Sequence, residues 1–159
     1  VKKFKELGGE ALMIDRGRDI GIEKGDLVID ENRLLVGVVA EVYDNISKIS
    51  IASNSGTAFE VLVLPLGVSS LARGVGARAF SLDLIPVDVP LRRGDLVALL
   101  GIENGIMEES GAKGSSRFSF LLGSVVSDES SPDSVFKEVK AVLLSRPEKL
   151  EEIFVVRRN

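Results

Sequence analysis

The segment around Lys113 comes closest to a catalytic or nucleotide-binding motif in this chain. It reads Gly111-Ala112-Lys113-Gly114-Ser115-Ser116. A phosphate-binding P-loop has its lysine after the second glycine, whereas Lys113 precedes Gly114. A Ser-Lys hydrolase needs a desolvated lysine as its base, and a loop rich in glycine, serine and glutamate keeps Lys113 hydrated and protonated. The segment therefore predicts a solvated loop rather than an active site.

The composition of the chain excludes several kinds of chemistry. Its 159 residues contain no histidine and no cysteine, which removes Ser-His-Asp and Cys-His nucleophile pairs and the usual zinc ligand sets. The net charge of −4 and the aromatic content of 5% argue against a nucleic-acid footprint and against stacking platforms. The acidic pair Asp128-Glu129 lacks the spacing of an EF-hand. We therefore expect no catalytic residue, no cofactor, no metal site and no nucleic-acid partner.

The elements that could position functional residues are almost all short strands. Hydrophobic residues make up 45% of the chain, enough for a packed core, and no apolar stretch reaches the roughly 20 residues of a membrane-spanning helix. Strands are predicted at about 11–15, 26–30, 34–42, 46–52, 58–64, 80–84, 95–100, 118–127 and 153–156. The segment 136–144 fits a strand or a helix.

Two helical segments are predicted at the ends of the chain. Val1–Leu7 contains helix formers and stops at a glycine pair, which indicates either a frayed tail or the last turn of an upstream helix. Ser145-Arg146-Pro147-Glu148 has the pattern of a capping box with proline at the first helical position. It predicts one short helix that ends at about Glu152.

One sequence phrase occurs twice and organises the chain. Gly25-Asp26-Leu27-Val28 returns 69 residues later as Gly94-Asp95-Leu96-Val97, and each copy is followed by an apolar run that holds one glycine, Gly37 or Gly123. A turn that closes on Gly-Asp, then a β-branched strand and a glycine-interrupted strand, is typical of a small curled antiparallel unit. The repeat predicts two small β-barrels.

The predicted boundaries follow from this repeat. Residues 1–10 are a linker or the end of a helix, 11–67 form the first barrel, 68–152 form the second, and the strand at 153–158 returns to the first. Gly37 and Gly123 are predicted to be corner glycines at which strands bend as the barrels close. The remaining candidate turn glycines are Gly17, Gly25, Gly74 and Gly94. Gly74 lacks the strand-then-helix setting of a dinucleotide fingerprint, so a turn or bulge is predicted there.

Seven short motifs follow one another in a characteristic order over residues 11–157. They are Ile14–Gly17, Gly21–Gly25, Leu35–Val39, Leu71–Gly76, Gly94–Val97, Gly123–Val126 and Pro147–Val156. This order resembles the extracytoplasmic core of the MreC family of cell-shape-determining proteins.

The resemblance implies an all-β, non-enzymatic scaffold of two closely packed six-stranded antiparallel barrels. In the family a membrane helix and a coiled-coil helix precede the barrels, so Val1–Leu7 would be the end of the coil and the membrane would be reached only through an anchor outside this chain. The implied location is the extracytoplasmic face of the cell membrane, in the machinery that builds side-wall peptidoglycan. The implied partners are the elongation transpeptidase of the penicillin-binding class, MreB, MreD, RodA and further copies of the chain.

The chain departs from the family pattern in the segment 101–118. Leu99-Leu100-Gly101 replaces the usual Thr-Ser-Gly step, and the loop that follows is long and acidic. Its apolar residues Ile102, Ile106 and Met107 are a candidate partner patch, although a plain surface loop also fits. Two other functions stay open: a small-ligand or lipid-carrying β-barrel, which needs an open apolar interior, and a Ser-Lys hydrolase that uses Lys113.

Overall fold

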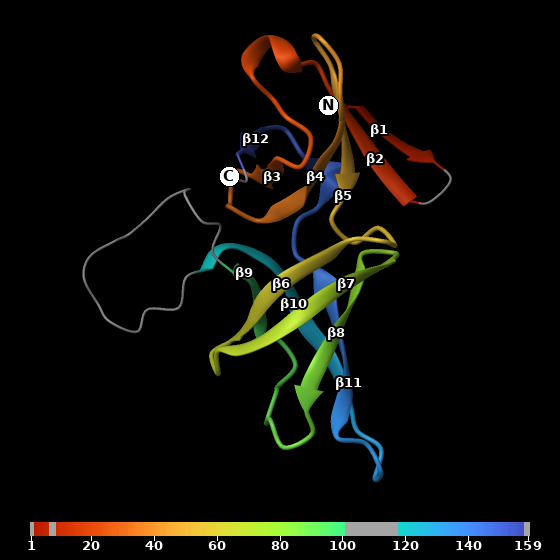
Figure 1. Ribbon diagram of the computed structural model, residues 1–159, viewed down its shortest axis with the longest axis vertical. Helices are drawn as coiled ribbons and strands as arrows, with labels where there is room; N and C mark the ends of the chain where they lie inside the picture. The colour runs from red at the N-terminus through yellow and green to blue at the C-terminus, as the bar shows by residue number, and fades with distance from the viewer. Residues whose placement is uncertain (1, 7–8, 101–117, 158–159) are drawn as a thin grey trace, which may run out of the picture.

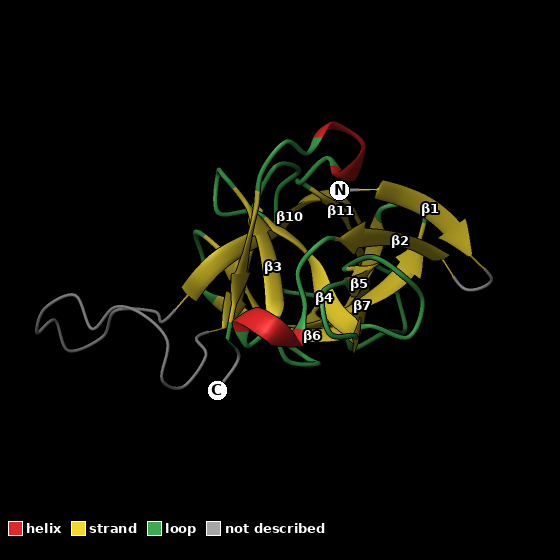
Figure 2. Ribbon diagram, turned by 90° about the horizontal axis from the view of Figure 1, so that it is seen from above, coloured by secondary structure: helices red, strands yellow, loops and turns green. Residues whose placement is uncertain are grey.

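The computed structural model describes residues 2–6, 9–100 and 118–157 of the chain. Within these ranges the regular structure is almost entirely β-strand, in two six-stranded sheets that lie one above the other in Figure 1. The helical segments of the described ranges are two 3-10 turns, η1 (Arg18–Ile20) and η2 (Pro147–Lys149), drawn red in Figure 2. The all-β class predicted from the sequence is confirmed.

The first sheet is open, with the strand order β1-β2-β5-β4-β3-β12. Its strands are β1 (Lys2–Glu6), β2 (Gly9–Ile14), β5 (Ser47–Ile51), β4 (Leu35–Val42), β3 (Leu27–Asp30) and β12 (Ile153–Val156). The described edge strands β1 and β12 do not pair with each other, so the predicted closure of the first barrel is not found. Because β12 has only four residues and β1 has a charged, lysine-rich sequence, both strands suit the edge of a sheet.

The second sheet is a closed barrel with the order β10-β11-β8-β7-β6-β9. Its strands are β10 (Phe118–Glu129), β11 (Phe136–Leu143), β8 (Ala79–Pro86), β7 (Val68–Gly76), β6 (Ala58–Leu64) and β9 (Leu96–Leu100). The segment that fitted a strand or a helix is the strand β11, which alternates exposed and buried side chains over most of its length. Closure of the sheet requires that alternation, since every second residue fills the interior.

The boundary between the sheets differs from the predicted one at residue 67. The prediction assigns strand β6 to the first unit, but β6 pairs with β7 and β9 in the closed barrel. The chain therefore passes from one sheet to the other between Ile51 and Ala58. It passes back after β11, and β12 pairs with β3, so the C-terminal strand does return to the first sheet. Local turn signals such as Pro65 mark hairpins as readily as domain boundaries, which is why the sequence places the boundary one strand late.

The predicted N-terminal helix is wrong for the described residues Lys2–Glu6. These residues form β1 and pair antiparallel with β2, from Lys2 opposite Met13 to Glu6 opposite Gly9. A helix of seven residues is marginal in water whatever its propensity, and ladder hydrogen bonds with a neighbouring strand outweigh that propensity.

The predicted C-terminal helix is reduced to the single 3-10 turn η2. Pro147 is at its first position as expected, but the residue that precedes the turn is Arg146, and no side chain caps it. The hydroxyl of Ser145, predicted to cap the helix, instead donates a hydrogen bond to the backbone oxygen of Leu35 at 2.9 Å. The capping box is therefore not formed, because the Ser145 hydroxyl is bonded to the backbone oxygen of Leu35 instead.

One continuous hydrophobic core extends through both sheets. Its fully buried side chains include Val28, Leu35, Ile49 and Ile51 from the first sheet and Phe80, Leu82, Leu122 and Leu143 from the barrel. The interior of the barrel is thus filled by aliphatic and aromatic side chains, as in other small barrels.

Several contacts fix the two sheets against each other. Leu34 forms an isolated bridge with Leu121, and the guanidinium of Arg33 lies 5.5 Å from the ring centre of Phe120. Arg78 donates to the backbone oxygen of Leu143 at the end of β11 (3.2 Å) and to that of Ser145 (3.0 Å) on the chain that returns to the first sheet. These contacts, with the shared core, place both sheets in one packed unit.

Candidate partner-binding surfaces

The described residues hold no acidic cluster suited to metal binding. Residues 9–100 and 118–157 contain no group of three or more acidic side chains that could hold a metal ion. The same part of the chain has no helix that is long and apolar enough to cross a membrane. The Ser115, Ser116 and Lys113 segment lies outside the described residues.

The two Gly-Asp turns of the repeat have the same hydrogen bonds. Gly25 (φ 94°) donates to the backbone oxygen of Val39 and Gly94 (φ 92°) to that of Val125, both at 2.8 Å. Each following aspartate accepts a hydrogen bond from the backbone three residues earlier, Asp26 at 2.9 Å and Asp95 at 2.8 Å. Both glycines have a left-handed φ that other residues adopt only with strain. The sequence repeat is therefore a repeat of local structure.

The strand glycines also occupy corresponding places. Gly37 lies opposite Val28 and Gly123 lies opposite Val97, and in each pair of strands the register shifts by one residue beside the glycine. A Cβ atom at Gly37 would lie 2.1 Å from the backbone oxygen of Ser50, and one at Gly123 would lie 2.3 Å from that of Val142. Both positions therefore have room for hydrogen only.

Gly17 and Gly74 are close-approach positions as well. A Cβ atom at Gly17 would lie 2.2 Å from the backbone oxygen of Tyr43, and one at Gly74 would lie 2.2 Å from that of Asn54. Gly74 belongs to strand β7, beside a register shift, and its amide donates to the backbone oxygen of Thr57 at 3.1 Å. It is part of a β-ladder and not of a phosphate-binding turn.

The predicted partner patch Ile102, Ile106 and Met107 lies outside the described residues. The two strands that flank this segment are described, and Leu100 pairs with Phe118. The strands on either side of the segment, β9 and β10, are therefore antiparallel neighbours in the barrel. Its role as a patch stays a prediction.

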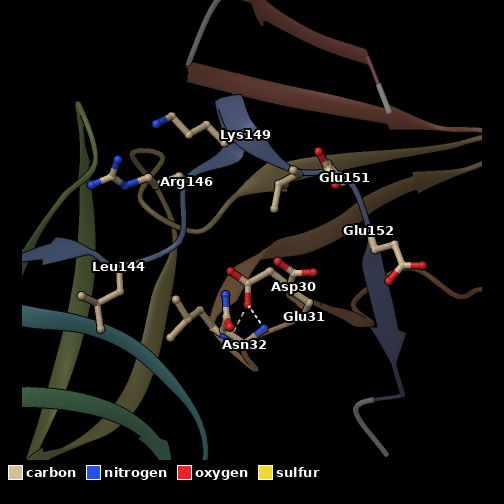
Figure 3. Close-up of a pocket in the computed structure, with 10 residues that line it drawn as sticks. Asp30, Glu31, Asn32, Leu144, Arg146, Lys149, Glu151 and Glu152 are labelled. Atoms are coloured by element: carbon tan, nitrogen blue, oxygen red, sulfur yellow. Dashed lines mark hydrogen bonds between the residues drawn. The ribbon is translucent and has the colours of Figure 1, made fainter.

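A groove of about 290 Å³ lies beside the turn between β3 and β4. Figure 3 shows its lining residues, which come from the turn after β3 and from the segment that leads into β12. The lining is mostly polar and charged, with Asp30, Glu31, Asn32, Leu34, Leu144, Arg146, Lys149, Leu150, Glu151 and Glu152. The Asp30 carboxylate accepts from the amides of Asn32 (2.8 Å) and Leu34 (3.0 Å), so it shapes its own turn. An open groove of mixed charge does not suit an apolar ligand.

An exposed tyrosine marks the end of the first sheet that is remote from the barrel. The Tyr43 hydroxyl donates to the Glu41 carboxylate at 2.6 Å, and Lys48 lies 3.6 Å from the same carboxylate. The hydrogen bond from Tyr43, together with the charge of Lys48, lowers the pKa of Glu41 below its ordinary value. The same hydrogen bond raises the pKa of Tyr43 above its ordinary value, because it stabilises the protonated phenol.

Four exposed apolar residues lie in or next to the parts of β8 and β11 that are far from the first sheet, at the lower end of the barrel in Figure 1. We call this surface the barrel tip; its residues are Leu84 (66% exposed), Val87 (41%), Val135 (72%) and Phe136 (44%). They lie where β8 ends and β11 begins, and the Val87 amide donates to the backbone oxygen of Val135 at 3.1 Å. Hydrophobic side chains gathered in this way commonly mark a binding surface.

The sequence pattern assigns Leu84 to the wrong face of its strand. Strict alternation from Phe80 and Leu82 predicts a buried Leu84, but the register shifts between the pairs Leu82–Val139 and Ile85–Lys137. Leu84 has a φ of 61° and points to solvent, while Ile85 is fully buried. A left-handed leucine costs about 1–2 kcal/mol. The adjacent pair Leu84-Ile85 is the signal in the sequence that alternation breaks here.

Comparisons with known proteins agree with this architecture. The family model described as rod shape-determining protein MreC, barrel core, matches residues 6–157. The cell shape-determining protein MreC of Haemophilus influenzae is 25% identical over 150 residues, which cover 89% of this chain and 41% of that protein. The chain therefore spans about two fifths of the length of this curated relative.

Two solved structures have a similar fold. MreC from Pseudomonas aeruginosa has a TM-score of 0.77 at 21% identity, covering 92% of this chain and 88% of that one. A complex between a penicillin-binding protein (PBP2) and MreC from Helicobacter pylori contains a chain with a TM-score of 0.55 at 19% identity, covering 88% of this chain and 83% of that one. Since the family model matches nearly the whole chain, and the closed barrel with its second sheet matches the solved folds, the chain belongs to the MreC family of rod shape-determining proteins.

Proposed function

We propose that this chain is the extracytoplasmic part of a non-enzymatic scaffold that helps to build the side wall of a bacterial cell. In this proposal it binds the elongation transpeptidase of the penicillin-binding class and works with MreB, MreD and RodA. It also associates with further copies of itself, and an N-terminal helix anchors it to the outer face of the cell membrane.

Family membership is the observation that carries this proposal. The matched family is described by its role in rod shape, and one MreC with a similar fold was solved in a complex with a penicillin-binding protein. A fold built of two packed sheets, with an interior filled by its own side chains, offers outer surfaces rather than an internal site. Such a molecule is suited to holding partners in position.

The rival function of a ligand-carrying barrel receives less support. A carrier needs an open apolar interior. Here the side chains of Phe80, Leu82, Leu122 and Leu143 inside the barrel are at most 2% exposed. The groove beside the turn between β3 and β4 is lined by side chains of both charges.

The proposal is tested by measuring binding to the transpeptidase itself. The immobilised chain is exposed to the extracytoplasmic domain of the elongation transpeptidase from the same organism in biolayer interferometry. The control is the division transpeptidase of the same enzyme class. We expect saturable binding of the elongation enzyme and much weaker binding of the control. Equal binding of both enzymes, or no binding of either up to the solubility limit, would contradict the proposal.

The remaining partners are tested with the full-length protein in cells. Photo-cross-linking from surface positions of the barrel should yield products with wall-synthesis proteins of the inner membrane, MreD and RodA among them. Recovery of ribosomal or nucleic-acid complexes instead would overturn the assignment.

A further inference from the structure

The barrel tip combines exposed hydrophobic side chains with a backbone that holds them in place. Leu84, Val135 and Phe136 have between 44% and 72% of their surface in contact with solvent. Two strands present them: Phe136 of β11 pairs with Pro86 of β8, and Lys137 pairs with Ile85. Phe136 lies in the ladder of a closed sheet, Leu84 lies in a bulge of the same ladder and Val135 directly precedes β11. A partner would therefore meet a surface that is already ordered, which lowers the entropic cost of binding.

A bulge directs Leu84 outward. The ladder steps from the pair Ile85–Lys137 to the pair Leu82–Val139, so Asp83 and Leu84 together face the single residue Glu138. Leu84 takes a left-handed φ of 61° at this place. Glycine or asparagine would adopt this conformation with less strain and would expose no hydrophobic surface. Leu84 therefore does not increase the stability of the isolated chain. Strained residues of this kind are concentrated at binding sites.

Two ion pairs near the barrel tip each neutralise one cation and one carboxylate. Two cations of the region are already paired: Lys137 lies 2.9 Å from the carboxylate of Asp128, and Arg73 forms an ion pair with Asp83. The Lys137 side chain is also only 7% exposed, so its charge faces inward.

Four further carboxylates lie near the apolar residues without an ion-pair partner among the described residues. They are exposed, and they are Asp88, Glu129, Asp133 and Glu138. Glu129 and Glu138 lie directly opposite each other on β10 and β11, an arrangement of like charges that weakens a sheet. The nearest exposed cation on β11 is Lys140, two residues beyond Glu138. Arg92 and Arg93 in the loop between β8 and β9 are exposed as well, so the four carboxylates of the rim outnumber the three exposed cations around it.

We propose that the barrel tip is the docking surface for a protein partner whose own surface presents hydrophobic side chains surrounded by lysine and arginine. An acidic rim attracts such a surface and is repelled by the anionic surface of a membrane. The inference rests on the proposed function in one respect, since we take the elongation transpeptidase as the partner that docks there.

The test compares tip variants with matched variants elsewhere on the same chain. Leu84→Asn removes the hydrophobic side chain and relieves the left-handed strain, and Phe136→Ser removes the aromatic ring. The controls are Ile20→Asn, at a 60% exposed isoleucine of the turn η1, and Phe154→Ser, at a 49% exposed phenylalanine of β12. Binding of the transpeptidase domain is measured for each variant by biolayer interferometry at low and high salt. Urea unfolding is measured in parallel.

The proposal makes a combined prediction for stability and binding. Leu84→Asn should unfold at the same or a higher urea concentration than the parent chain and should still bind about tenfold or more weakly, as expected for a residue at the centre of an interface. Phe136→Ser should weaken binding similarly, and both controls should bind within about twofold of the parent, well inside the tenfold effect of an interface residue. Raising the salt concentration, or replacing Glu129 and Glu138 by lysine, should also weaken binding.

Three other binding results would contradict the inference, and they differ in what they imply for the proposed function. If the parent chain binds and the tip variants bind equally well, the tip is not the docking surface, while the proposed function stands. If the parent chain does not bind the transpeptidase at all, the proposed function fails and this inference fails with it. Binding of the chain to phosphatidylglycerol vesicles that Leu84→Asn abolishes would overturn the inference in favour of a membrane surface.

Discussion

Replacing Gly37 or Gly123 by alanine tests whether the repeated glycines exist because backbones approach each other there. In a strand without such contacts, alanine is more stable than glycine by about 0.5–1 kcal/mol, because it restricts the unfolded chain. At these positions the new Cβ would lie 2.1 Å from the Ser50 oxygen and 2.3 Å from the Val142 oxygen, against 3.4–4 Å for ordinary contact. The backbone of a neighbouring central strand would have to move.

Alanine at Gly37 or Gly123 should therefore destabilise the chain, whereas alanine in place of glycine in an uncrowded strand stabilises it. Overpacking of this kind costs about 1–3 kcal/mol. For a chain of this length, each kcal/mol lowers the melting temperature by roughly 2–4 °C. Valine at either position should be worse than alanine, because its branches need still more space.

Gly25 supplies a matched control, since it is a repeat glycine constrained for a different reason. Its φ is 94° and no atom lies within 4 Å of the place that a Cβ would occupy, so alanine there meets strain without a clash. Asparagine tolerates the left-handed region better than alanine does. We therefore expect Gly25→Asn to be milder than Gly25→Ala, and Gly37→Asn to be more harmful than Gly37→Ala.

Urea unfolding followed by circular dichroism measures all of these variants, with the slope of the transition as a check that the unfolded state is unchanged. The reasoning is refuted if Gly37→Ala or Gly123→Ala equals or exceeds the parent chain in stability. It is also refuted if the alanine and asparagine variants have the same order of stability at Gly25 as at Gly37.

Two further predictions concern single hydrogen bonds. Ser145→Ala should destabilise the chain by about 1–3 kcal/mol, because it leaves the buried Leu35 oxygen without its partner, whereas the exposed Ser130→Ala should change the urea midpoint little. Tyr43→Phe should raise the pKa of Glu41 toward its ordinary value near 4.5 in a carboxyl NMR titration. Since the folded-state pKa of Glu41 is lowered, its contribution to stability is present above the ordinary pKa and is lost as the pH falls through the folded-state pKa. The stability of Tyr43→Phe should therefore differ least from that of the parent chain in acid. An unchanged pKa of Glu41 in the variant would contradict this prediction.

The sequence predicted the class of the fold because the two patterns that indicate it, the Gly-Asp turns and the strands of alternating polarity, are local. The two Gly-Asp turns need a left-handed glycine wherever they occur, and the structure has them at Gly25 and Gly94 with the same hydrogen bonds. Strands with alternating polarity were recognised to within a few residues for the same reason. The partner patch predicted at Ile102, Ile106 and Met107 lies outside the described residues and stays a prediction.

The errors concern properties that depend on distant residues. Val1–Leu7 has helix formers, yet Lys2–Glu6 pairs with β2 as a strand. Ser145 is followed by a capping pattern, yet its hydroxyl reaches the Leu35 oxygen 110 positions away in sequence. Neither partner is visible from the local sequence.

The sequence by itself determined that the chain is built of short antiparallel strands with a repeated turn and without thiol or imidazole chemistry, because residue type and spacing suffice for these properties. Only the tertiary structure decided which sheet each strand joins, that the second sheet closes while the first stays open, and that Leu84 points to solvent. Membership in a sheet depends on pairing energies summed over remote strands, as the transfer of β6 to the barrel illustrates. The face on which a side chain lies depends on a one-residue shift in register, which reverses every position beyond it.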